Sequence, residues 1–253
     1  MSAQVPEARA AIQIDALGKR FGDTGPLVLD NVSLRIEPGE FVCLLGASGC
    51  GKSTLLNIIA GLERPTTGSV RVESGNAAVM FQDAALFPWL SARRNVELAL
   101  SLRGVPREWR RAQALELLDI VNLADAAEKR PHELSGGMRQ RVALARSLAQ
   151  DRPVLLMDEP FAALDAITRD LLHEELELVW RRTGRTIVFV THNVREAARL
   201  GQRVLLMSSR PGRIANEWRI ADNGPRRIES PEVASLAIEI TDQLRKEIRR
   251  NAA

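Results

Sequence analysis

Apolar positions along the chain fall into short runs that are separated by longer stretches of helical spacing. Strand-like runs cover residues 12–17, 28–36, 41–45, 154–157, 186–190 and 203–207. Because these runs alternate with helical patterns, we expect an α/β fold with a mostly parallel sheet. Two further runs, residues 69–73 and 77–81, are expected to form a short hairpin that turns at Ser74-Gly75-Asn76.

The middle of the chain has a different pattern, because helical spacing dominates from Ala92 to Gln150. Only Gly104-Val105-Pro106 and the region of Pro131 interrupt it, and glycine and proline are the residues that most often end helices. We therefore expect a helical subdomain inserted between the early and late strands. A helix is also predicted from Lys52 to Ala60.

The last part of the chain predicts one further helix. Ser230 is a suitable N-cap, and Pro231 suits the first helical position. One face of the helix is apolar, through Val233, Leu236, Ala237, Ile240, Leu244 and Ile248. We expect this face to dock on the chain's own core, with dimerisation or partner contact as the alternative.

Composition restricts the class of protein. The chain has 253 residues, 45% apolar content and a net charge of +3, with basic and acidic residues interleaved. That mixture predicts a solvated surface, with a basic patch that binds nucleic acid as the alternative. Cys43 and Cys50 have no spacing typical of zinc or disulfides, which indicates a reducing compartment.

Membrane insertion is not expected either. Glu7 and Arg9 stand where a signal peptide would be apolar, and no apolar run approaches the roughly 20 residues of a spanning helix. If the protein works at a membrane, a partner chain must do the spanning.

The first glycine-rich segment reads Gly46-Ala47-Ser48-Gly49-Cys50-Gly51-Lys52-Ser53-Thr54 and matches the phosphate-binding pattern G-x-x-x-x-G-K-[ST]. It follows a strand pattern and precedes a helix pattern, which is the context the motif requires. Lys52 is placed to reach the β- and γ-phosphates of a nucleoside triphosphate, and Ser53 to offer its hydroxyl to Mg²⁺. Thr54 is placed to assist with phosphate.

A pair of acidic residues follows the buried strand pattern 154–157. Asp158 and Glu159 therefore stand at the carboxyl end of a strand, where open α/β sheets bind ligands. Asp158 suits Mg²⁺, directly or in its outer sphere, and Glu159 suits a general base that polarises an attacking water.

The second glycine-rich segment is Leu134-Ser135-Gly136-Gly137-Met138. Helical spacing continues after it through Val142, Ala145 and Leu148, so the glycines begin a helix and do not end one. Ser135 can cap this helix, and Gly136 and Gly137 permit an anion to approach its positive end.

With these motifs, the chain resembles the ATP-binding subunit of an ABC transporter. The resemblance covers nearly the whole chain, as far as Arg219. The resemblance makes Leu134–Met138 the signature segment, with Met138 where Gln is commonest. It implies that Ser135, Gly136 and Gly137 contact the γ-phosphate of ATP held by a second copy of the chain. It also implies a P-loop NTPase core with an antiparallel β subdomain, and an active ATPase that uses ATP and Mg²⁺.

Four other positions match the family one by one. Gln82 corresponds to a glutamine that helps to hold Mg²⁺ and senses the membrane partner, although alone it would be a solvated loop residue. Ala163-Leu164-Asp165 resembles the D-loop, which crosses to the other protomer, and Asp165 can also cap a helix. His192 corresponds to the switch histidine at the γ-phosphate, and Asn193 follows it where Asp is usual. Phe21 stands where an aromatic ring stacks on adenine, with a core role as the alternative.

The two remaining histidines, His132 and His173, lack such context and are expected at the surface. On the resemblance, residues 1–83 are the first part of the nucleotide-binding core and 84–150 the helical subdomain. Residues 151–222 are then the second part of the core, and 223–253 the C-terminal tail.

Within the family, the segment from Phe81 to Leu90 resembles the nitrate, sulfonate and taurine importers. The hairpin expected around Gly75 and the string Met80-Phe81-Gln82-Asp83 look closest to the aliphatic-sulfonate members. Phe87, Pro88 and Trp89 are expected to grip a coupling helix of a membrane permease. The resemblance implies a homodimer at the cytoplasmic face of the membrane, a permease, and indirectly an extracytoplasmic solute-binding protein. The alternative is a non-transport ABC ATPase acting on nucleic acid or ribosomes, although the chain lacks coiled-coil arms and a second ATPase unit.

Overall fold

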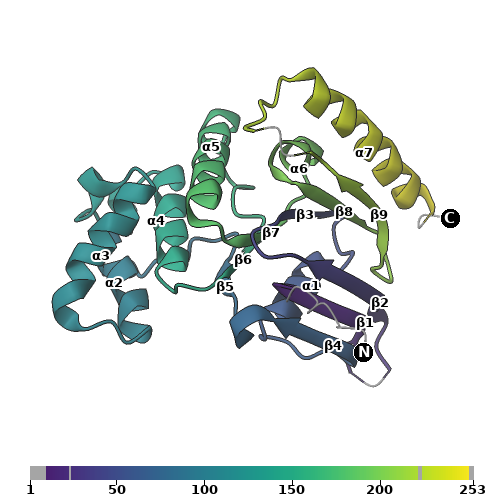
Figure 1. Ribbon diagram of the computed structural model, residues 1–253, viewed down its shortest axis with the longest axis horizontal. Coiled ribbons are helices and arrows are strands. Elements are labelled where there is room, and N and C mark those ends of the chain that lie inside the picture. The colour runs from purple at the N-terminus through teal and green to yellow at the C-terminus, as the bar shows by residue number, and fades with distance from the viewer. Residues whose placement is uncertain (1–9, 23, 222–223, 251–253) are drawn as a thin grey trace, which may run out of the picture.

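A computed structural model of the chain describes residues 10–22, 24–221 and 224–250. The prediction that rests on Glu7 and Arg9 lies outside the described residues. Two sheets organise the fold (Figure 1), one of three strands in the order β2-β1-β4 and one of six in the order β5-β6-β7-β3-β8-β9.

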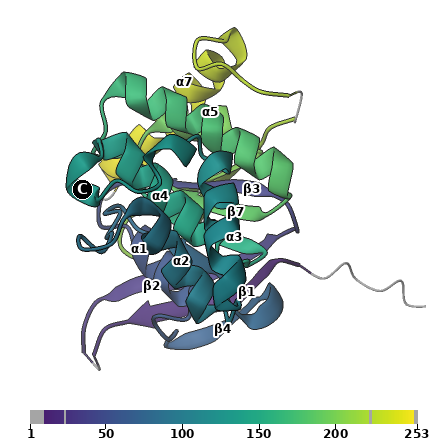
Figure 2. The same ribbon diagram turned by 90° about the vertical axis from the view of Figure 1, so that its left-hand side faces the viewer.

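The three-stranded sheet is antiparallel throughout. It contains β1 (Ile12–Arg20), β2 (Leu27–Ile36) and β4 (Thr67–Val72). Its buried face carries Ile12, Ile14, Leu34 and Ile36, as expected for strands with one face toward the core. Figure 2 shows this sheet on the opposite side of the molecule from the last helix.

The six-stranded sheet is parallel except at one edge. Its parallel strands are β3 (Phe41–Gly46), β5 (Ala78–Met80), β6 (Val154–Asp158), β7 (Thr186–Val190) and β8 (Arg203–Met207). The strand that pairs antiparallel with β8 is β9 (Ile214–Arg219), which the sequence patterns did not predict. Its side chains alternate between partly buried and exposed, because successive side chains of a strand point to opposite faces of the sheet.

The hairpin predicted at residues 69–81 is wrong. β4 pairs with β1 in the small sheet, whereas β5 pairs in parallel with β6 in the large one. A single 3-10 turn, η1 (Glu73–Gly75), carries the chain from one sheet to the other. Turn residues between two strand patterns indicate a change of direction, but they do not determine which strands become neighbours.

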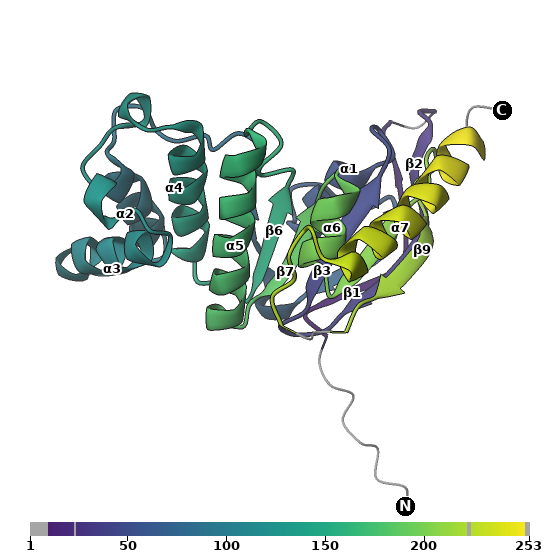
Figure 3. The same cartoon turned by 90° about the horizontal axis from the view of Figure 1, so that it is seen from above.

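The predicted helical middle is confirmed as α2 (Ala92–Leu102), α3 (Arg107–Ile120) and α4 (Gly136–Leu148). The breaks fall at the expected glycine and proline positions, with the short turns η2 (Ala124–Ala126) and η3 (Pro131–Glu133) before α4. The remaining core helices are α1 (Lys52–Ile59), α5 (Ala166–Thr183) and α6 (Val194–Leu200). Figures 1 and 3 place α2 and α3 at one end of the molecule.

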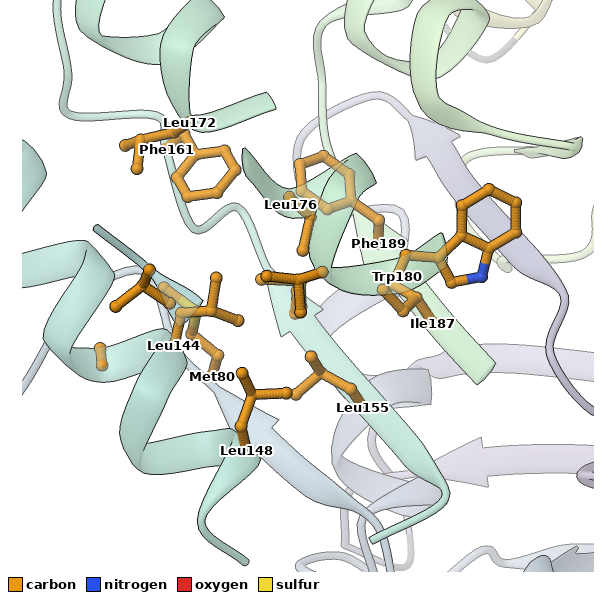
Figure 4. Packing of buried hydrophobic residues seen from close by; sticks show 14 of the residues in the cluster. Met80, Leu144, Leu148, Leu155, Phe161, Leu172, Leu176, Trp180, Ile187 and Phe189 are labelled. Carbon is orange, nitrogen blue, oxygen red and sulfur yellow. The ribbon is translucent and has the colours of Figure 1, made fainter. Parts of the chain in front are cut away.

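The hydrophobic core is continuous between the helical middle and the large sheet. Leu144 and Leu148 of α4 belong to the same buried cluster as Met80 and Leu155 of the sheet (Figure 4). Helix α4, which follows the signature segment, therefore packs on the same core as β6, the strand that leads to Asp158 and Glu159.

The tail forms the predicted helix, α7 (Pro231–Arg250), and the Ser230 hydroxyl accepts a hydrogen bond from the Val233 N–H at 3.3 Å. Val233, Ala237 and Ile240 are buried. Docking on the chain's own core is thus confirmed, with α7 against α6 (Figure 3). None of the helices in the described ranges is long and apolar enough to cross a membrane.

The surface position predicted for His173 is wrong, whereas His132 is exposed as expected. His173 is completely buried in α5, with its ring against Phe161 at 5.6 Å between centroids. Burial, helped by the charges of Arg199 and Arg169, lowers the pKa of His173 from 6.5 to about 3.

This buried histidine predicts acid sensitivity. Below pH 6.5 the unfolded chain binds a proton at His173 that the folded chain does not, so the free energy of unfolding falls as pH decreases from 6.5 toward about 3. One such group contributes a slope of up to about 1.4 kcal/mol per pH unit. Chemical denaturation at several pH values should show a smaller slope for His173→Gln and an unchanged slope for His132→Gln. Equal slopes in all three proteins would contradict this explanation.

Candidate nucleotide-binding site

The first glycine-rich segment forms a loop between β3, which is buried throughout, and the start of α1. Gly51 caps the helix in the left-handed region with φ 101°, a conformation that glycine adopts readily. A Cβ at this position would also lie 2.7 Å from Leu29 Cδ2. The first N–H groups of a helix have no partner within it, so the loop presents donors at the positive end of α1.

Lys52 lies across this loop. Its ammonium donates hydrogen bonds to the carbonyls of Gly46 at 2.9 Å and Ala47 at 3.2 Å, and only 6% of the residue is exposed. A buried cation held by neutral carbonyls is incompletely balanced. An anion that enters the loop supplies the missing charge.

Three other predicted residues meet beside the loop at the ends of β6 and β7. Burial raises the pKa of Asp158, and the adjacent Ser53 hydroxyl partly opposes that shift. Glu159 has a φ of 46°, and its N–H donates to the Val190 carbonyl at 3.0 Å, which aims the side chain away from the strand. Glu159 Oε2 then lies 2.9 Å from His192 Nδ1.

Gln82 stands on the exposed loop after β5. Its backbone carbonyl accepts a hydrogen bond from Gln140 Nε2 of α4 at 2.8 Å, while its own side chain faces solvent. A cleft of about 380 Å³ lies here and joins the Gln82 loop to the signature segment and the D-loop, with lining residues Gln82, Asp83, Ala84, Gly136, Arg139, Gln140, Ala163 and Leu164.

Phe21 is not a core residue. It is 49% exposed at the end of the small sheet, so the core alternative is wrong. The Lys19 ammonium lies 4.7 Å from the ring centroid and also pairs with Glu63 at 2.6 Å. Adenine stacking by Phe21 stays a prediction.

The second glycine-rich segment begins α4, as predicted. The Ser135 hydroxyl caps the helix by accepting from the Met138 N–H at 3.2 Å. The D-loop lies beside it, and Asp165 caps α5 by accepting from the Thr168 N–H at 3.0 Å. This hydrogen bond lowers the pKa of the exposed Asp165 carboxyl.

The structure adds a packing reason for the signature glycines. A Cβ on Gly137 would lie 2.5 Å from Thr168 Cγ2 of α5, and one on Gly136 would lie 3.1 Å from Leu164 Cδ2 of the D-loop. The two glycines therefore allow α4 to pack closely on α5 and the D-loop.

This close approach gives a stability prediction. We expect Gly137→Ala to lower the free energy of unfolding by about 1–3 kcal/mol, because overpacking outweighs the better helix propensity of alanine. Thr168→Ser removes the opposing methyl group, so the double variant should recover most of the loss. Denaturant unfolding measures the stability of the single and the double variant. A Gly137→Ala protein as stable as the parent would contradict the prediction, because the close approach would then carry no energetic penalty.

The structure divides these residues into two groups within one chain. The phosphate loop leads into α1, with Asp158 beside Ser53 and the Glu159–His192 pair at the adjoining strand ends. Ser135 instead caps α4, where Gly136 lies against Leu164 of the D-loop. Figure 3 shows α1 and α4 separated by α5 and β6.

Comparison with known proteins agrees with this architecture. The family described as ABC transporter matches residues 29–162. The nitrate import ATP-binding protein NrtD of Synechocystis sp. is 47% identical over 230 residues, which cover 87% of this chain and 86% of NrtD. The taurine import ATP-binding protein TauB of Chromobacterium violaceum is 44% identical over 242 residues, covering 90% and 93% of the two chains.

Solved structures give the same result. The post-hydrolysis dimer of the ATP-binding cassette MJ0796 with ADP and Pi has a TM-score of 0.71 and 35% identity, and covers 83% of this chain and 99% of its own. The chain belongs to the ABC transporter family, as an ATP-binding subunit with a P-loop NTPase fold. It is an ATPase that powers transport.

Sequence reasoning missed one part of this region. A largely buried polar cluster between α5 and α6 contains His173, Glu196 and the partly exposed Arg169, and it contacts both the D-loop and the segment of His192. Helical spacing could have placed Arg169 and His173 on one face of α5, but nothing in the sequence indicated that α6 would cover it.

Proposed function

We propose that two copies of this chain bind two ATP molecules between them. In each site, one copy contributes Lys52 and the phosphate loop, and the other contributes Ser135 and the signature glycines. The observation that carries this proposal is the separation of the two anion-binding helix ends within one chain (Figure 3). Each end presents donors to phosphate, and α5 and β6 lie between the two helices in the same copy (Figure 3).

The residues beside the phosphate loop fit the chemistry of hydrolysis. Glu159 would accept a proton from the attacking water, and its contact with His192 Nδ1 orients its carboxylate. His192 would contact the γ-phosphate, and Phe21 would stack on adenine. The oxygen donors Ser53, Gln82 and Asp158 suit Mg²⁺, which when bound would neutralise charge on the β- and γ-phosphates.

An exposed aromatic surface marks the side that we assign to a membrane permease. Phe87 and Trp89 contact each other at 5.4 Å between ring centroids, and Trp89 is 67% exposed. A groove of about 400 Å³ adjoins them, with lining residues Phe87, Leu98, Ala99, Leu102, Arg103, Arg146, Gln150 and Arg152. A groove that combines apolar side chains with arginines, beside an exposed aromatic pair, suits a short helix of a partner, here the coupling helix of a permease near residues 82–90.

Trp89→Ala tests this assignment. We expect the variant to keep ATP binding and to lose most co-purification with its permease, because an exposed aromatic anchor typically contributes about 2 kcal/mol or more to an interface. Trp109→Ala is the matched control, because Trp109 of α3 is also exposed, at 60%, but is not part of the Phe87–Trp89 aromatic pair. Equal retention of permease by both variants would place the interface elsewhere.

We further infer that the system imports a small anionic nutrient. The printed activities of the relatives, nitrate and taurine import, support this class, and an aliphatic sulfonate is the substrate that we favour. A solute-binding protein outside the membrane would select it, and this subunit would act at the cytoplasmic face. The alternative, a non-transport ABC ATPase, has less support because these relatives are import proteins.

ATPase stimulation identifies the substrate. In the reconstituted transporter, binding protein loaded with an aliphatic sulfonate should raise ATP turnover more than binding protein offered taurine or nitrate. A larger response to taurine or nitrate would reassign the substrate while leaving the split site untouched.

A further inference from the structure

A polar cluster between α5 and α6 is buried although it has no part in the phosphate chemistry proposed above. Its members are Arg169 and His173 on α5, Glu196 on α6 and Thr191 just before the α6 cap. Glu196 is 5% exposed, Thr191 3% and His173 0%, whereas the side chain of Arg169 is 24% exposed. Burial of a carboxylate is unfavourable and needs compensating partners, so its contacts indicate what the cluster does.

One side of the cluster fixes the segment of His192. The Thr191 hydroxyl donates to Glu196 Oε2 at 2.6 Å and accepts from the Asn193 N–H at 3.0 Å. The Asn193 side chain in turn caps α6 by accepting from the Arg195 N–H at 3.0 Å. His192 therefore lies between two residues whose positions depend on Glu196.

The other side of the cluster fixes the D-loop. Arg169 Nη2 donates to the Leu164 carbonyl at 2.7 Å, and its Nε lies 3.6 Å from Glu196 Oε1. Leu164 precedes Asp165 and also lies at the close approach of Gly136. One guanidinium thus connects the D-loop to the carboxylate that holds Thr191.

The cluster is incompletely hydrogen-bonded. Both ring nitrogens of His173 and the Nε atom of Arg169 are buried without a hydrogen-bond partner, and His173 Nε2 lies 3.7 Å from Glu196 Oε1. Unsatisfied buried polar groups reduce stability and call for an explanation. Coupling between the D-loop and the segment of His192 is such an explanation.

We propose that Arg169 and Glu196 are positioning residues that couple the D-loop to His192. The D-loop would contact the ATP site completed by the partner copy, whereas His192 serves the chain's own site. The arrangement of one site would therefore determine the alignment of His192 in the other, which makes hydrolysis in the two sites interdependent. This inference rests on the proposed split site.

The test compares Glu196→Gln, Arg169→Lys, Arg169→Ala and the double variant Arg169→Ala/Glu196→Gln in the full chain. Glu196→Gln keeps an acceptor for Thr191 but removes the charge. Arg169→Lys keeps the charge, but an ammonium lacks the planar guanidinium that contacts the Leu164 carbonyl and Glu196 at the same time. We expect each single variant to lower kcat about tenfold and to lower the Hill coefficient for ATP toward 1, with KM and ATP affinity changed less than about twofold.

The double variant should be no slower than the slower single variant, because the two residues act as one unit. Glu177→Gln is the matched control, since Glu177 is a buried carboxylate of α5 that pairs with Arg181 at 3.1 Å and lies about two helical turns from Arg169. It should leave both kcat and the Hill coefficient unchanged. Thermal unfolding of every variant separates a loss of fold from a loss of positioning.

Three results would overturn the proposal: an unchanged Hill coefficient, additive losses in the double variant, or a defect confined to ATP affinity. Glu159→Gln in the same assay distinguishes a failure of the coupling from a failure of the proposed hydrolytic site. If Glu159→Gln is inactive while Arg169 and Glu196 variants behave as the parent, only the coupling fails. If Glu159→Gln retains full turnover, the proposed role of Glu159 as general base is wrong, whatever the Arg169 and Glu196 variants show.

Discussion

Glu159→Gln is expected to lower ATP turnover by about two to four orders of magnitude while ATP binding remains. Glutamine has the same size as glutamate but cannot accept a proton from water. The hydrogen-bonding distance to His192 can persist, because the Glu159 Oε2–His192 Nδ1 contact of 2.9 Å needs only a polar atom. The variant should therefore bind ATP without consuming it.

Steady-state phosphate release and equilibrium binding of ATP measure the two parts of this prediction. Asp151→Asn is a suitable control, because Asp151 is an exposed acidic residue just before β6, at the end opposite the acidic pair. It should leave turnover unchanged. Turnover in Glu159→Gln close to that of the parent would remove Glu159 from the role of base.

Lys52→Ala is expected to weaken ATP binding by at least about 100-fold. The substitution removes a charge-assisted contact to phosphate, which contributes roughly 1.5–3 kcal/mol, and the electrostatic attraction of a buried cation adds to it. The Lys52 ammonium donates to the carbonyls of Gly46 and Ala47 and interacts electrostatically with Asp158, and we expect the variant to remain folded.

Fluorescent nucleotide titration measures the affinity, and thermal unfolding without nucleotide checks the fold. Lys129→Ala is the control, because this exposed lysine belongs to the helical middle. It should bind ATP as the parent does. Unchanged affinity in a folded Lys52→Ala protein would contradict the assignment of the phosphate loop.

The sequence was most informative where local chemistry and strand–loop–helix order agree. The phosphate loop, the cap of α4 at Ser135 and the cap of α5 at Asp165 all depend on residues within a few positions of each other. Each was therefore predictable from a short segment.

Features that depend on distant neighbours were not predictable in this way. The partner of β4 is set by packing on β1, not by the turn at Ser74. The burial of His173 depends on α6, which follows it in the chain. The contact between Gly137 and Thr168 joins two segments whose motifs gave no indication that they touch.

The central claim is that one ATP site requires two copies of this chain. Molecular mass in solution, measured by light scattering on Glu159→Gln with and without ATP, tests it most directly. We predict that the mass doubles when ATP is added, with about one nucleotide retained per chain, and that adding Ser135→Arg restores the single-chain mass without preventing ATP binding. A single-chain mass throughout, or equal doubling in the Ser135→Arg protein, would contradict the split site.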